Sequence, residues 1–143
     1  MDNLGDVYGL QGRFDDGERL LKQGLELLDR SFGNWAEAAL NYDKMLNDLG
    51  NLYLDAGRLR DAEATMRRAL AVTRARSGDA HPNVAATMGN LATVLEHEAR
   101  YAEAEKLNQQ TLQVYERIYG ANHPTTAIAL NNLANVYSAQ GRN

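Results

Sequence analysis

The feature that most constrains this chain is an internal repeat of 42 to 45 residues that runs through all 143 residues. The two His-Pro pairs, His81-Pro82 and His123-Pro124, are 42 residues apart. Leu4-Gly5 and Leu49-Gly50 are 45 apart, and Leu91-Ala92 follows after another 42. A fixed period of roughly 20–50 residues indicates stacked supersecondary units. The sequence therefore predicts one repeat array, 1–143, with units of about 1–33, 34–78, 79–120 and 121–143, the first and last of them incomplete.

Each unit has the hydrophobic pattern of two helices. In the second unit the apolar and small residues of the first helix are Tyr42, Leu46, Leu49, Gly50 and Tyr53, in steps of four, three, one and three. Such steps mark one face of an α-helix. Seven helices are expected, over about 1–11, 14–32, 36–55, 58–77, 82–97, 100–119 and 124–140.

The His-Pro pairs mark two helix starts. Pro82 and Pro124 suit the first helical turn, where a missing N–H has no intrahelical acceptor. His81 and His123 occupy equivalent loop positions one repeat apart, too far from each other to share a metal ion. We therefore expect both histidines to cap their repeats.

The repeat resembles a known family. The pattern Leu46-x2-Leu49-Gly50-x2-Tyr53, followed by Ala62-x3-Met66, is similar to the tetratricopeptide repeat, and the other copies start at Met1, Met88 and Leu130. The 42-residue period with Gly-x-x-His-Pro resembles the kinesin light chain subtype, which also occurs in bacterial and fungal signalling proteins. The resemblance implies an all-α, right-handed superhelix of helix-turn-helix repeats whose first helices line a concave groove that binds proteins. Asn108 and Thr111 depart from the apolar and small residues of that pattern.

Composition excludes several classes of protein. The formal net charge is −4, and the isoelectric point near 5.3 lacks the basic footprint of nucleic-acid binding. The absence of cysteine excludes disulfides and thiol nucleophiles and suits a cytoplasmic location. The sequence has no apolar run long enough to span a membrane. Because it also lacks a phosphate-binding glycine loop and a plausible catalytic constellation, we expect a non-enzyme with no cofactor and no metal.

The candidate binding residues lie on the first helices, on the stripe that the core does not use. Asparagine is a poor helix former, yet it recurs there, and its amide can satisfy the backbone of an extended peptide as both donor and acceptor. The predicted peptide-binding residues are Lys44, Asn47, Asp48, Asn51, Asn90, Thr93, His97, Asn131, Asn132 and Asn135. The alternative is that asparagine is merely tolerated on a solvated helix face.

The charges of the candidate binding residues predict which kind of peptide binds. Asn51 and Asn90 match the two asparagines of tetratricopeptide grooves that clamp a C-terminal carboxylate, but the cation positions of those grooves hold Asn47, Ile128 and Asn132. The sequence therefore argues against such a clamp. Acidic residues are concentrated in the N-terminal half of the stripe, so a neutral or mildly basic peptide is the better electrostatic match.

The last helix suggests a second interpretation. Leu130, Leu133 and Tyr137 are expected to lack the cover of a following second helix. The chain is then either a piece of a longer array or a structural module that forms homo-oligomers through its open ends.

Overall fold

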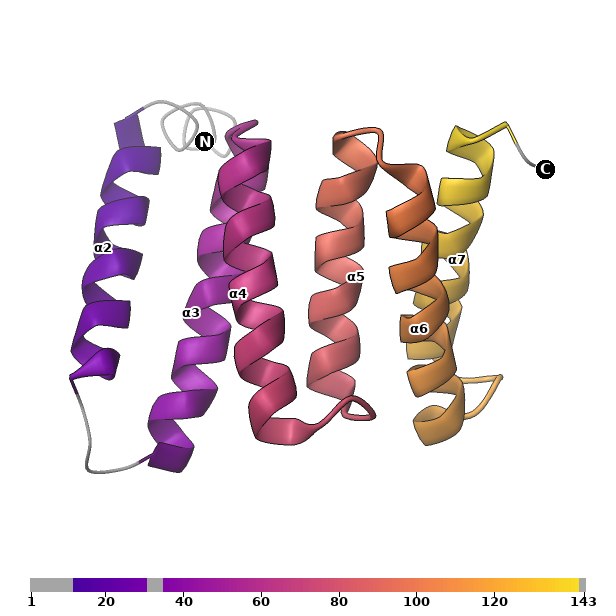
Figure 1. Ribbon diagram of the computed structural model, residues 1–143, viewed down its shortest axis with the longest axis horizontal. Coiled ribbons are helices and arrows are strands. Elements are labelled where there is room, and N and C mark those ends of the chain that lie inside the picture. The colour runs from indigo at the N-terminus through magenta and orange to yellow at the C-terminus, as the bar shows by residue number, and fades with distance from the viewer. Residues whose placement is uncertain (1–11, 31–34, 142–143) are drawn as a thin grey trace. The chain divides into compact units, whose positions relative to one another are not determined.

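The computed structural model describes residues 12–30 and 35–141, and in these ranges every regular element is an α-helix (Figure 1). The helices are α2 (Gly12–Asp29), α3 (Trp35–Asp55), α4 (Leu59–Ser77), α5 (Pro82–His97), α6 (Tyr101–Tyr119) and α7 (Pro124–Ala139). These bounds agree with six of the seven predicted helices to within three residues. The remaining one, over about 1–11, lies outside the described residues. The chain divides into two compact units, with the boundary between Ala69 and Leu70. Each unit is described by itself.

The first unit has its core between α2, α3 and the first part of α4. Phe14 of α2 contacts Tyr53 of α3 with ring centroids 5.9 Å apart, and both side chains are buried. Met66 of α4 lies directly on Gly50 of α3, since a Cβ built at Gly50 would be 2.7 Å from the Met66 Cε. The absence of a side chain at Gly50 thus lets the two helices approach closely.

The second unit has its core on α5. The positions of α5 that lie 42 residues after the apolar and small residues of the second unit are all at most 2% exposed: Val84, Met88, Leu91, Ala92 and Leu95. Helix α6 packs against both α5 and α7, and these three helices lie side by side in Figure 1. Every apolar position predicted for α5 therefore lies in the core.

Histidine caps the helices that begin with proline. The Nδ1 of His81 accepts a hydrogen bond from the backbone N–H of Asn83 at 3.0 Å, and the Nδ1 of His123 accepts one from Thr125 at 3.1 Å. Both histidines have the extended backbone of an N-cap residue. The predicted capping role is confirmed at both positions.

The turns between paired helices share one geometry. Gly57 and Ala99 have φ angles of 77° and 60°, and in each turn the next residue, Arg58 or Arg100, donates its N–H to a carbonyl five residues earlier at 2.9 Å. This is the Schellman ending, which favours glycine at the left-handed position. The second turn has alanine there.

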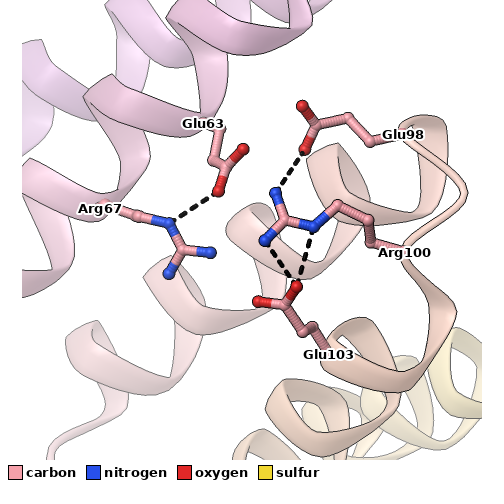
Figure 2. A network of polar contacts seen from close by, with 5 residues as sticks. All are labelled: Glu63, Arg67, Glu98, Arg100 and Glu103. Carbon is pink, nitrogen blue, oxygen red and sulfur yellow. Dashed lines mark hydrogen bonds and ion pairs between the residues drawn. The ribbon is translucent and has the colours of Figure 1, made fainter.

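An arginine follows the left-handed residue in both turns. Arg58 pairs with Asp61 at 2.7 Å, and Arg100 pairs with Glu103 at 2.5 Å. Figure 2 shows Arg100 reaching both Glu103 and Glu98, and it also shows the separate pair of Arg67 and Glu63 on α4. Exposed pairs of this kind are each worth less than about 1 kcal/mol. They therefore contribute little to the stability of the fold.

Two residues that depart from the repeat pattern are buried in α6. Thr111 is 3% exposed, and its hydroxyl donates to Ala85 O at 3.1 Å and Leu107 O at 2.9 Å. Asn108 is 1% exposed, and its Nδ2 atom has no hydrogen-bond partner among the described residues. The threonine is satisfied by the backbone, whereas the asparagine amide is not.

Candidate functional site

The predicted site residues of the first unit lie on one face of α3. Lys44 and Asn51 are exposed, and Asn47 and Asp48 are half-buried. The Nζ of Lys44 is 3.0 Å from an Asp48 carboxylate oxygen, and Asn47 donates its amide to Asp43 O at 2.9 Å. We call these four residues the α3 face. The only cation on it is offset by the neighbouring aspartate.

In the second unit, α5 carries three of the predicted residues. Asn90 and Thr93 are half-buried and His97 is exposed. The Thr93 hydroxyl donates to Gly89 O at 3.1 Å, and the His97 Nδ1 lies 2.8 Å from Thr93 O. Because a carbonyl oxygen can only accept, this contact requires a hydrogen on the His97 Nδ1.

The other three predicted residues lie on α7. Asn131 and Asn135 are exposed, and Asn132 is half-buried. Helix α7 contacts α5, so the structure brings these six polar residues of the second unit onto two neighbouring helices. We call them the α5–α7 face. Ile128 is 61% exposed on α7 and adds a large apolar side chain to the surface of that helix.

Burial affects one acidic group beside this face. Glu96, next to His97, is half-buried, and its desolvation raises the pKa of its carboxyl group above the ordinary value of 4.5. A positive charge on His97 acts in the opposite direction, and its effect is smaller. Glu96 is therefore protonated more readily than an exposed glutamate.

The residues predicted to lack cover have three different environments. Leu130 is 47% exposed, Tyr137 is half-buried and Leu133 is only 9% exposed. The described helices already cover most of the Leu133 side chain, and its place in an oligomer interface stays a prediction. The hydroxyl of Tyr137 lies 3.4 Å from the Gln109 amide nitrogen. Leu130 alone matches the expected exposed apolar position.

Two kinds of feature are absent from the described part of the chain. No three His, Asp or Glu side chains there gather as a metal-binding group. No helix in the same residues is both long and apolar enough to cross a membrane.

The structure holds one polar feature that the sequence did not predict. A cavity of about 230 Å³ in the second unit is lined by Arg74 and Arg117, among other residues. A signal was present in the repeat, because the positions equivalent to Arg74 in the other copies are Asp29 and Glu116. An arginine at a position that is acidic in the other copies indicates that Arg74 has a role specific to this copy.

Family comparison agrees with the repeat pattern along the whole chain. One tetratricopeptide repeat model matches residues 41–116 and 84–143, and a second tetratricopeptide repeat model matches residues 1–43. No curated protein sequence shows a significant match to the chain.

Solved structures share the fold. BtubC (BKLC) from P. vanneervenii superposes with a TM-score of 0.82 at 22% identity, over 96% of this chain and 53% of that one. A Podospora anserina protein described as a kinesin light chain with nearly identical TPR-like repeats gives 0.78 at 19% identity, over 98% and 65%. A single-substitution variant of that protein gives the same values. The chain thus spans between half and two thirds of these proteins, and the likeness confirms the predicted all-α repeat fold of the superhelical class.

Proposed function

Because the chain belongs to the tetratricopeptide repeat family, whose repeats are protein–protein interaction modules, we propose that it binds an extended peptide segment of a partner protein. The proposed contacts are the α3 face and the α5–α7 face. The observation that carries the proposal is that Asn51, Asn131 and Asn135 are exposed within first helices, although asparagine is a poor helix former. In keeping with a family of non-catalytic scaffolds, the proposed role is binding alone.

Asparagine suits a partner that is held by its backbone. One amide group offers two donors and an acceptor, so it can pair with both the C=O and the N–H of an extended peptide. Such pairing depends little on peptide sequence. Selectivity would then come from the side chains between the asparagines, including the exposed Ile128.

The charges favour a neutral or mildly basic peptide. Lys44 is paired with Asp48, and Asp55 is a further exposed acid at the end of α3. An acidic peptide would meet these carboxylates without a free cation on the α3 face, whereas a basic one would be attracted. A cytoplasmic and signalling role stays a prediction of the sequence.

Self-association is the second candidate, and one observation favours it. Leu130 is 47% exposed, whereas its repeat equivalents Leu46 and Met88 are 1% and 2% exposed. An apolar side chain of this size at an otherwise buried repeat position could pack on a second copy.

A selection experiment separates the two candidates. Peptides chosen from a random library on the wild-type chain are measured against the triple variant Asn51→Ala/Asn90→Ala/Asn135→Ala. Three lost hydrogen bonds should weaken binding by at least about tenfold. The matched control is Asn83→Ala/Asn122→Ala, which removes exposed asparagines outside both faces and should leave affinity unchanged.

Two results would count against peptide binding by these faces. One is equal affinity for wild type and the triple variant at equal thermal stability. The other is the absence of any selected peptide together with a dimer in sedimentation experiments that Leu130→Glu dissociates. The second result would establish the self-association candidate in its place.

A further inference from the structure

A cavity away from the α5–α7 face has the composition of an anion site. It lies among the end of α4, the loop that follows it, Met88 of α5 and the second half of α6, and all of its lining residues belong to the second unit. We propose that it binds the carboxylate of a glutamate or aspartate side chain in an acidic peptide segment. None of its lining residues belongs to the α3 face or the α5–α7 face. This proposal can therefore be refuted or supported separately from the proposed function.

Arg74 is the ordered cation of this cavity. Its Nε lies 2.7 Å from the Asp79 carboxylate, and its Nη2 lies 3.6 Å from the sulfur of Met88, which is 2% exposed. These contacts fix the plane of the guanidinium group, so little side-chain freedom is left to lose on binding. Asp79 is 81% exposed and lies at the rim.

Arg117 is the second cation, from the last turn of α6. Its side chain is exposed, and it makes no ion pair with any residue in 12–30 or 35–141. With Arg74 and Asp79 nearby, the cavity keeps one uncompensated positive charge in a chain whose net charge is −4. Gln110 and Gln113 line the same cavity and add neutral amide donors.

The repeat itself shows that these side chains are not needed for the fold. The equivalents of Arg74 in the other copies are Asp29 and Glu116, and those of Arg117 are Ala75 in α4 and Arg30 after α2. The pair that corresponds to Arg74 and Arg117 one repeat earlier is Asp29 and Ala75, so two arginines occur together at these positions only here. A local binding role explains that difference, whereas helix packing does not.

Size and geometry favour a single carboxylate. The cavity volume of about 230 Å³ is below the roughly 300–1,000 Å³ of small-molecule pockets, so one side chain fills it. A planar guanidinium pairs with a planar carboxylate through two parallel hydrogen bonds. The exposed edge of Arg117 is free to make such a pair.

The test is a titration of the isotope-labelled full chain with capped tetraglutamate, followed by the NMR signals of the arginine Nε–H and glutamine amide groups. We expect the signals of Arg74, Arg117, Gln110 and Gln113 to shift with a dissociation constant on the order of 1 mM. Arg117→Gln should weaken binding about fivefold, and Asp79→Asn should tighten it about two- to threefold, because the competing carboxylate is removed. Lys106→Gln, the same charge change on an exposed part of α6, should have no effect.

Opposite changes in affinity for Arg117→Gln and Asp79→Asn distinguish binding in the cavity from general electrostatic attraction to the chain. The proposal is overturned if Arg117→Gln and Lys106→Gln weaken binding equally, or if Asp79→Asn does not tighten it. Tighter binding of inorganic phosphate than of tetraglutamate at the same ionic strength would also overturn the assignment to a carboxylate. Unchanged affinity with a lowered melting temperature in Arg117→Gln would show that this arginine only stabilises the end of α6.

Discussion

Asn108 in α6 occupies the repeat position that Met66 occupies in α4, and the two side chains are 1% and 0% exposed. Met66 fills this position with apolar atoms against Gly50. Asn108 brings an amide whose Nδ2 has no hydrogen-bond partner in the described part of the chain. A buried unsatisfied donor costs about 1–3 kcal/mol, so this position weakens the second unit.

Asn108→Leu should therefore raise the free energy of unfolding by about 1–3 kcal/mol, because the unsatisfied amide is replaced by apolar atoms of similar size. Urea denaturation measures the change. Asn131→Leu, at an exposed position in α7, reports the gain from helix propensity alone, which is about 0.5 kcal/mol. Equal gains for the two variants would show that the buried amide carries no penalty.

The turn at Ala99 offers a second prediction about stability. Ala99 has a φ angle of 60°, which costs an alanine about 1–2 kcal/mol relative to glycine. Ala99→Gly should thus stabilise the chain by about 0.5–1 kcal/mol, since part of the gain is lost to the greater freedom of glycine when unfolded. Gly57→Ala, the reverse change at the equivalent turn, should destabilise it by about 1 kcal/mol. Thermal melting checks both signs, and a destabilised Ala99→Gly would contradict the account.

Glu18 in the first unit predicts a pH dependence. Its carboxylate accepts a hydrogen bond from the Tyr53 hydroxyl at 2.5 Å and lies 3.0 Å from the Lys22 Nζ. The Tyr53 hydrogen bond, followed by that from Lys22, holds the pKa of Glu18 below its ordinary value of 4.5. Because the folded pKa is the lower one, the resulting stability is complete above pH 4.5 and is lost as the pH falls toward the folded value.

The measurement compares wild type with Glu18→Gln in urea between pH 7 and pH 3. Wild type should be more stable at pH 7, and the difference should shrink below about pH 4.5. Glu26→Gln, at an exposed position on the same helix, is the control and should show no such pH-dependent difference. A difference between wild type and Glu18→Gln that stays constant over this range would contradict the prediction.

The histidine caps predict a graded effect of substitution. His81→Ala removes the acceptor for the Asn83 N–H and should cost about 1 kcal/mol, as other N-cap truncations do. His81→Asp keeps an acceptor at this position and should recover most of the loss. His97→Ala, at an exposed position late in α5, should change stability by less than about 0.5 kcal/mol. Equal melting temperatures for His81→Ala and His81→Asp would show that the cap does not matter.

The elements that could be predicted from the sequence are those that repeat. The proline starts, the histidine caps and the core face of α5 follow from local chemistry that recurs every 42 residues, so the pattern identifies them without coordinates. Gly57 and Ala99 are likewise 42 residues apart and adopt the same turn. Repetition supplies an internal comparison that a single globular domain lacks.

Features of a single copy could not be predicted in the same way. Whether Thr111 and Asn108 find partners depends on the distance to carbonyl groups of another helix, which only coordinates give. The burial of Leu133 depends on how α7 lies against its neighbours. For the candidate site, the sequence placed asparagines on first helices, but it did not show that Asn47 bonds to its own helix backbone.

The central claim is that asparagine amides on the first helices hold a peptide, and their own NMR signals test it most directly. A selected peptide is titrated into the isotope-labelled chain, and the side-chain NH₂ signals of Asn51, Asn90 and Asn135 are followed beside those of the control residues Asn83 and Asn122. The account predicts saturable shifts for the first three at one common dissociation constant and no shift for the two controls. Shifts confined to residues around Leu130, or to α4 and α6, with the signals of Asn51, Asn90 and Asn135 unmoved at saturation, would contradict it.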